Sequence, residues 1–193
     1  ELYPDSVFDH PAKMQMYLVK AVMDYYTSPR DKVLDPFGGT GTTALMALYG
    51  REVTLIELEQ VFVDLLLEVR KKWRAEVDAD FTLLAGDSRQ VIKGLPAESY
   101  NLVFTSPPYA NLQVGKVQTE FTGQLLEEKA RMMQYGSSAA HPQNFGRLNQ
   151  FLFNNSMSVI YREVARVLKP GESILVLLKT KCEQERGIIT QWK

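Results

Sequence analysis

Short runs of apolar residues recur along the chain and alternate with longer amphipathic stretches. The runs are rich in β-branched and aliphatic residues, which favour strands. They lie at 33–35, 53–57, 81–85, 102–105 and 173–178. Near-continuous apolar runs of this kind are typical of parallel strands that are covered on both faces. The pattern therefore predicts five buried strands.

Three amphipathic stretches predict helices between these strands. One has apolar residues at helical spacing and basic residues around them; its apolar positions are Phe62, Leu66, Val69 and Trp73. A second covers 160–168, where Lys169-Pro170-Gly171 is expected to end the helix, and a third covers 18–26. Strands and helices in alternation, joined by right-handed crossovers, predict one α/β domain over 1–193 with a doubly wound, mostly parallel sheet.

The stretch from 109 to 157 interrupts this alternation. It shows no strand pattern; a helix is expected from Leu125 to Met133, and residues 136–142 are typical of a loop. A segment of this length without a strand is usually functional or disordered in a compact domain. We interpret it as an insertion on the substrate side of the domain.

The composition is that of a globular domain, with 45% hydrophobic and 23% charged residues. No apolar run approaches the roughly 18 residues that a membrane span needs, so no membrane contact is expected. The first residues lack the basic and apolar regions of a signal peptide. A single cysteine, Cys182, excludes a disulfide framework and a cysteine-based zinc site, and no metal is expected. The sequence thus predicts a cytoplasmic protein.

The net charge of −1 conceals an uneven distribution. Residues 1–108 carry 11 basic and 16 acidic side chains, whereas residues 109–193 carry 11 and 7. One interpretation is chance combined with solvated helix faces. The other is that the positive second half faces a polyanion such as a nucleic acid.

A glycine- and threonine-rich turn follows the first predicted strand. It spans Asp35-Pro36-Phe37-Gly38-Gly39-Thr40-Gly41-Thr42-Thr43, and a helix is expected from there to about Gly50. Glycines permit a sharp turn and the close approach of a ligand, and free amides at a helix start attract polar groups. The turn contains no lysine, which argues against a phosphate loop of the Walker type.

Two further carboxylates follow the next two strands. Glu57 lies 22 residues beyond Asp35, the spacing of an acidic residue that binds ribose hydroxyls, and Asp87 ends the third strand. Parallel strands bring these ends to one edge of the sheet, where open α/β folds bind ligands. Taken singly, each fits equally well as a helix cap or turn residue.

The fourth strand ends in Thr105-Ser106-Pro107-Pro108-Tyr109. Two prolines cannot donate to a ladder, so a stiff turn is expected at the same edge. The glycine turn followed by Ser-Pro-Pro-Tyr resembles the S-adenosylmethionine-dependent DNA amino-methyltransferases, which methylate exocyclic nitrogens of cytosine or adenine. His10-Pro11-Ala12-Lys13 and Leu168-Lys169-Pro170-Gly171-Glu172 also look like motifs of that family.

The resemblance covers about residues 9–180 and implies a Rossmann-like class I methyltransferase fold. Such a sheet normally has seven strands, so the last strands are expected to be missing. The cofactor implied is S-adenosyl-L-methionine, with Glu57 on the ribose and Asp87 on the adenine amino group. The cofactor-binding residues implied are His10, Lys13, Asp35, Phe37, Gly38, Gly39, Thr40, Gly41, Thr42, Glu57, Asp87 and Ser88.

The same resemblance assigns the target-base site to Ser106, Pro107, Pro108 and Tyr109. Serine in the first position resembles the cytosine-N4 branch of the family. The expected function is thus methyl transfer to the N4 amino group of cytosine in DNA. Adenine-N6 methylation, methylation of an RNA amino group and a non-catalytic nucleic-acid-binding subunit stay open as alternatives. DNA contacts are expected from Lys116, Arg131 and Arg147; a companion subunit, a dimer and a restriction endonuclease are the other partners considered.

Overall fold

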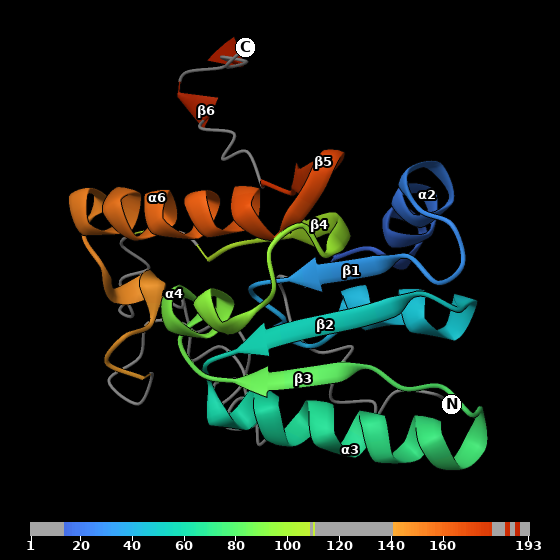
Figure 1. Ribbon diagram of the computed structural model, residues 1–193. Coiled ribbons are helices and arrows are strands. Elements are labelled where there is room, and N and C mark those ends of the chain that lie inside the picture. The colour runs from blue at the N-terminus through green and yellow to red at the C-terminus, as the bar shows by residue number, and fades with distance from the viewer. Residues whose placement is uncertain (1–13, 109, 111–140, 179–183, 186–187, 190–193) are drawn as a thin grey trace.

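The computed structural model describes residues 14–108, 110 and 141–178, together with the backbone of 184–185 and 188–189. Parallel strands form a sheet with the order β3-β2-β1-β4-β5 (Figure 1). Their bounds are β1 Lys32–Asp35, β2 Glu52–Glu57, β3 Thr82–Ala85, β4 Tyr100–Thr105 and β5 Leu168–Val176. The predicted strands are therefore confirmed, and so is the parallel, doubly wound sheet.

Helices cover both faces of this sheet. Those of the described residues are α2 Met16–Tyr26, the 3-10 helix η1 Thr42–Tyr49, α3 Gln60–Glu76, α4 Ser88–Val91, the short 3-10 helices η2 Ile92–Gly94 and η3 Phe145–Arg147, and α6 Gln150–Val167. The helices expected at 18–26, 62–73 and 160–168 correspond to α2, α3 and α6. None of the helices in the described residues has both the length and the apolar character of a membrane span.

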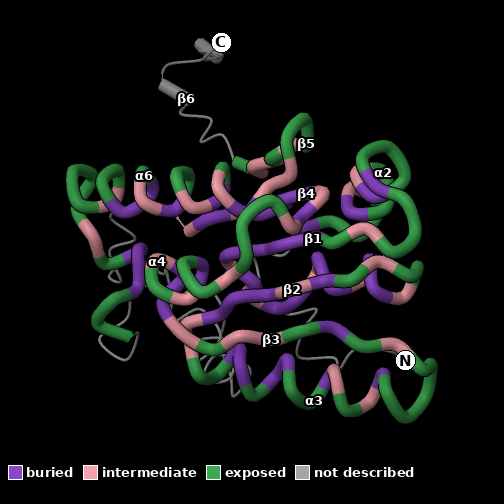
Figure 2. The backbone as a smooth tube through the Cα atoms, viewed as in Figure 1, coloured by how far each residue is buried: buried purple, intermediate pink, exposed green. Residues whose placement is uncertain are grey.

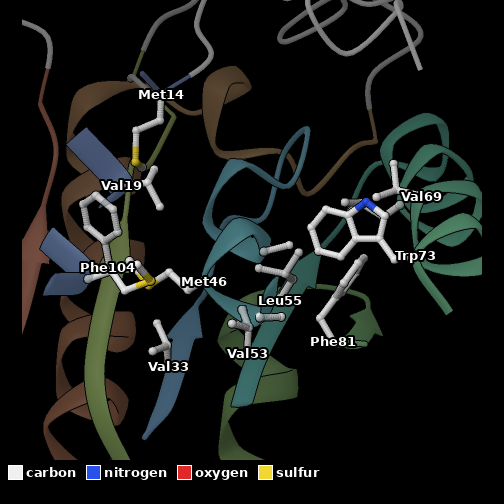
Figure 3. Close-up of a cluster of buried hydrophobic side chains, with 14 of the residues drawn as sticks. Met14, Val19, Val33, Met46, Val53, Leu55, Val69, Trp73, Phe81 and Phe104 are labelled. Atoms are coloured by element: carbon white, nitrogen blue, oxygen red, sulfur yellow. The ribbon is translucent and has the colours of Figure 1, made fainter. Parts of the chain in front are cut away.

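Alternation along the strands divides the core into two layers, because successive side chains point to opposite faces. One face, with Val33, Leu55 and Leu102, packs against α2, η1 and α3. The other, with Leu34, Ile56 and Val103, packs against α6 and η2. Figure 3 shows part of the first layer, where the rings of Trp73 and Phe81 meet edge to face at 5.6 Å.

Burial is greatest at the centre of the sheet and falls toward its edges. Figure 2 shows mostly buried positions along β1, β2 and β4. Strands β3 and β5 contain only intermediate and exposed positions. The expectation of strands covered on both faces therefore holds for the central strands and is wrong for the two edge strands.

The boundary between α6 and β5 differs from the prediction. Strand β5 begins at Leu168, directly after α6, instead of at 173, and Pro170 and Gly171 lie inside it. The register with β4 shifts between Tyr100 and Leu102, and Gly171 has a positive φ of 85°. An edge strand tolerates such an irregularity, so this Pro-Gly pair bends a strand and does not separate it from the helix.

The predicted insertion at 109–157 ends earlier than expected, because α6 begins at Gln150. Residues 150–157 form the first half of α6, which Asn149 caps by accepting from the N–H of Leu152 at 2.9 Å. The helix expected from Leu125 to Met133 lies outside the described residues. Beyond the sheet, β6 Gln184–Glu185 and β7 Ile188–Ile189 form a small antiparallel pair that the sequence did not suggest.

Candidate functional site

The carboxyl ends of β1 and β4 mark the point where the order of the strands reverses. Chain segments leave these two neighbouring strands toward opposite sides of the sheet, which opens a crevice in α/β folds. The glycine turn follows β1 and Ser106 follows β4, while Glu57 and Asp87 stand at the ends of β2 and β3. The edge that the sequence predicted is therefore assembled in the fold.

Asp35 joins three segments at this edge. Its Oδ1 accepts from the N–H of Phe37 at 3.0 Å and from the hydroxyl of Thr105 at 2.6 Å. Its Oδ2 accepts from the hydroxyl of Thr43 at 2.7 Å. Burial raises the pKa of the Asp35 carboxyl, while the bonds from Thr105, Thr43 and Phe37 lower it. The side chain thus organises the turn and the end of β4 from inside the protein.

Packing explains two glycines of the turn. Gly41 has a φ of 80°, and a Cβ there would lie 2.4 Å from Cδ2 of Leu66 in α3. A Cβ on Gly38 would lie 3.2 Å from Cβ of Leu55 in β2. These glycines let the turn pack closely against β2 and α3. The sequence alone did not distinguish this packing role from a role in making room for a ligand.

Glu57 is buried at the end of β2 and holds the turn against the start of α3. Its Oε2 accepts from the N–H of Gly39 at 2.6 Å. Its Oε1 accepts from the N–H groups of Leu58 and Glu59, each at 2.8 Å. Burial raises the pKa of Glu57 to about 7, although these backbone bonds act in the opposite direction. The carboxyl therefore titrates near neutral pH.

Asp87 is the N-cap of α4, accepting from the N–H of Arg89 at 2.9 Å. The Arg89 guanidinium also binds this carboxylate, with Nη2 at 2.6 Å from Oδ2 and Nε at 3.0 Å from both oxygens. Ser88 donates its hydroxyl to the carbonyl of Pro36 in the glycine turn. A ligand amino group at Asp87 would share the carboxylate with Arg89.

Arg89 also connects α4 with the segment that leads into α6. Its Nη1 donates to the hydroxyl of Ser156 at 3.1 Å, and its guanidinium carbon lies 5.0 Å from the ring centre of Phe145. The buried ring of Phe145 meets Phe37 of the glycine turn edge to face at 5.3 Å. Residues that are far apart in the sequence thus pack at one place.

Glu59 fastens the same segment to the end of β2. Its carboxylate accepts from the N–H of His141 at 3.1 Å and from the side-chain amide of Asn144 at 2.5 Å. Asn144 in turn caps η3 by accepting from the N–H of Gly146 at 2.8 Å. The C-terminal part of the predicted insertion therefore lies against the edge that carries Glu57.

The end of β4 is held against β5. The N–H of Leu177 donates to the carbonyl of Thr105 at 2.8 Å, and the Ser106 hydroxyl donates to the carbonyl of Leu177 at 3.3 Å. Because its proton is used in this bond, the oxygen of Ser106 is left to act as an acceptor. Pro107 is buried and Pro108 half-buried.

The fold brings together most of the site residues predicted from the sequence. Those at the edge are Asp35, Phe37, Gly38, Gly39, Thr40, Gly41, Thr42, Glu57, Asp87, Ser88, Ser106, Pro107 and Pro108. Arg147 lies in η3 and is exposed. His10, Lys13, Tyr109, Lys116 and Arg131 lie outside the described residues. The assignment of these residues to a cofactor, a base or DNA stays a prediction.

Sequence reasoning did not identify several residues that build this edge. Thr105 stands beside the Ser-Pro-Pro-Tyr motif, and Arg89 stands two positions after Asp87, so proximity to a motif was the available signal. Glu59, Asn144 and Phe145 gave no such signal, because their partners are distant in the sequence.

Comparisons with known proteins agree with this architecture. Residues 3–68 match a family model described as DNA methylase. Among solved structures, the chain is similar to a Methanococcus maripaludis protein assigned to the S-adenosyl-L-methionine-dependent methyltransferases. Identity is 9% and the TM-score 0.51, over 91% of this chain and 64% of that one. No curated protein sequence matches the chain.

Two other structures show the same fold. A SAM-dependent methyltransferase from Methanosarcina mazei is 15% identical, with a TM-score of 0.50 over 80% of this chain and 55% of that one. The PH0226 protein from Pyrococcus horikoshii is 18% identical, with a TM-score of 0.50 over 82% and 53%. The chain thus spans between 53% and 64% of these three structures. Its fold is the Rossmann-like fold of S-adenosylmethionine-dependent methyltransferases.

Proposed function

We propose that the chain transfers a methyl group from S-adenosyl-L-methionine to the N4 amino group of cytosine in DNA. The observation that carries this proposal is Ser106, an oriented acceptor directly after β4, where the order of the strands reverses between β1 and β4. The DNA methylase match over 3–68 and the methyltransferase fold support the same chemistry.

The residues at the edge suit the proposed cofactor. Glu57 and Asp87 supply acceptors for ribose hydroxyls and for an adenine amino group. When bound, the cofactor supplies an electrophilic methyl group. Phe37 and the glycine turn lie between these two carboxylates and Asp35, where they would bind the methionine end.

The chemistry left to the protein is the alignment of a weak nucleophile. The lone pair of a cytosine amino group is delocalised into the ring, so orientation and polar contacts must favour its attack. Ser106 Oγ and the carbonyl of Pro107 can accept hydrogen bonds from that NH₂ group. Tyr109 would stack on the base, which must leave the duplex to reach the site.

The test is a comparison of Ser106→Ala with the parental chain in single-turnover methylation of unmethylated double-stranded plasmid DNA. Loss of the acceptor should lower the rate about 10²-fold with little change in cofactor affinity. Ser99→Ala is the matched control, because it removes a hydroxyl that donates to the carbonyl of Pro96 at 2.8 Å away from the crevice. A folded Ser106→Ala protein that works at the parental rate would contradict the mechanism.

Cofactor binding is tested separately by calorimetry. Glu57→Ala should weaken S-adenosylmethionine binding by about 1–3 kcal/mol, because it leaves ribose hydroxyls without an acceptor. Unchanged affinity would remove Glu57 from the cofactor site.

Nucleoside analysis of the product distinguishes the alternatives. N4-methylcytosine supports the proposal, N6-methyladenine places the chain with the adenine enzymes, and methylation of RNA alone identifies an RNA amino-methyltransferase. A chain that binds nucleic acid and fails to bind the cofactor is a non-catalytic subunit.

A further inference from the structure

We propose that Thr105 is a positioning residue for methyl transfer, whose hydroxyl fixes the end of β4, and with it Ser106, relative to the glycine turn. This inference rests on the proposed function, since it concerns the same crevice. It concerns a residue that neither binds the cofactor nor touches the base.

The first observation is the hydrogen bond between Thr105 and Asp35. Thr105 is 2% exposed, and its Oγ1 donates to Oδ1 of Asp35 at 2.6 Å. Asp35 is also 2% exposed, so both partners are removed from water. A buried carboxylate that loses a donor is strongly destabilised. The hydroxyl of Thr105 therefore has one well-defined partner, on the neighbouring strand.

The second observation is where the backbone pairing of β4 stops. On the β5 side, pairing continues to Thr105↔Val176, and the N–H of Leu177 donates to the carbonyl of Thr105 at 2.8 Å. On the β1 side, the pairs recorded end at Leu34↔Val103. Beyond this last pair, the bond between Thr105 and Asp35 connects β4 and β1 through their side chains.

The bond between Thr105 and Asp35 fixes the distance between Ser106, which follows β4, and the glycine turn, which follows β1. Asp35 is fixed to the glycine turn through the N–H of Phe37 at 3.0 Å, and Ser106 is fixed to β5 through Leu177. The Thr105 hydroxyl joins these two groups through Asp35, between the ends of β4 and β1. Without it, the end of β4 keeps its contacts with β5 and can shift relative to the turn. A displacement of about 1 Å in a reacting group can lower a rate about 10²-fold.

The experiment compares three variants in the full chain. Thr105→Val keeps the shape and removes the hydroxyl, Thr105→Ser keeps the hydroxyl, and Thr43→Val removes the other buried hydroxyl that donates to Asp35. Thr43 lies in η1, and its hydroxyl bond to Asp35 does not involve β4. It is therefore a matched control for the loss of a donor from the same carboxylate.

We expect Thr105→Val to lower the single-turnover rate with plasmid DNA at saturating S-adenosylmethionine by about 10- to 100-fold. Its cofactor dissociation constant should change by less than about threefold, and Thr105→Ser should recover the rate to within about threefold of the parent. The factor by which Thr43→Val lowers the single-turnover rate should be at least about fivefold smaller than the factor for Thr105→Val.

Three results would overturn the inference: equal falls for the two valine variants, no rescue by serine, or failure of Thr105→Val to fold. Hydrogen exchange gives a readout that needs no activity. The peptide from Leu102 to Pro108 should exchange faster in Thr105→Val than in Thr43→Val. If the parental chain methylates no DNA, the proposed function fails, and the exchange comparison still decides whether Thr105 positions the end of β4.

Discussion

At the scale of single residues, burial and backbone hydrogen bonds oppose one another at Glu57. Removal of the carboxylate from water favours the protonated form, whereas three N–H donors favour the ionised form. Burial is the larger effect, and the pKa rises from 4.5 to about 7. The protonation of this one side chain therefore couples stability to pH.

The sign of that coupling follows from the two pKa values. Between pH 4.5 and 7, Glu57 is ionised in the unfolded chain and protonated in the folded one, so its contribution to stability falls as pH rises. The total change is about 3 kcal/mol, since one pKa unit corresponds to about 1.4 kcal/mol. Urea unfolding at several pH values measures it. Glu57→Gln should flatten this slope, and Glu76→Gln, at an exposed position of α3, should not.

The three carboxylates show what the sequence can predict at this scale. Strand spacing placed Asp35, Glu57 and Asp87 at one edge, because the ends of parallel strands coincide. It could not predict the partners of these side chains. Asp35 binds Thr105, 70 residues away, and Asp87 is both a helix cap and the partner of Arg89. The cap interpretation of Asp87 is thus confirmed, and its role toward a ligand stays a prediction.

At the scale of elements, apolar runs identified the strands well and the ends of helices poorly. Lys169-Pro170-Gly171 looked like a helix stop, yet α6 ends at Val167 and the Pro-Gly pair lies within an edge strand. The first turns of α6 were missed because Phe151 and Leu152 are exposed, 71% and 47%, so apolar positions do not mark the buried face there. Tertiary packing determines where α6 begins and ends, and the pattern of apolar residues in the sequence does not reveal that packing.

The bond between Glu59 and Asn144 predicts an energetic coupling between α3 and η3. In a double-mutant cycle with Glu59→Ala and Asn144→Ala, the two losses of unfolding free energy should fall short of additivity by about 1 kcal/mol or more, because the amide binds a charged group. Urea unfolding of the four proteins gives this term. Gln150→Ala, whose side chain contacts Asn154 within α6, is the control that should add independently to Glu59→Ala. Additive losses for Glu59 and Asn144 would show that the contact carries no energy.

At the scale of the whole molecule, strands β1 to β4 all belong to the acidic half of the sequence, and the basic half begins directly after the two prolines that follow β4. If the positive half faces DNA, affinity for duplex DNA should fall steeply as salt rises, because bound counterions are released. Substitution of Lys116, Arg131 or Arg147 by alanine should each reduce the slope of log affinity against log salt by about one. Lys71→Ala, at an exposed position of α3 in the acidic half, should leave the slope unchanged. Binding that is insensitive to salt would make a nucleic-acid substrate untenable.

The strand order also sets the sequence in which the molecule can fold. Val33 pairs with Val53, 20 residues further on, and Thr54 pairs with Thr82, 28 residues further on. Val33 also pairs with Leu102, and Leu102 with Ser173, which closes loops of about 70 residues in each case. Short loops lose less entropy on closure, so β1, β2 and β3 should associate first.

Pulse-labelled hydrogen exchange during refolding measures this order. Amides of β2 should gain protection before those of β4, and simultaneous protection of all strands would contradict the expectation. On a ribosome, where the N-terminal part emerges first, the same order applies. A growing chain therefore completes β1, β2 and β3, with the carboxylates at their ends, before β4, the strand that delivers Ser106.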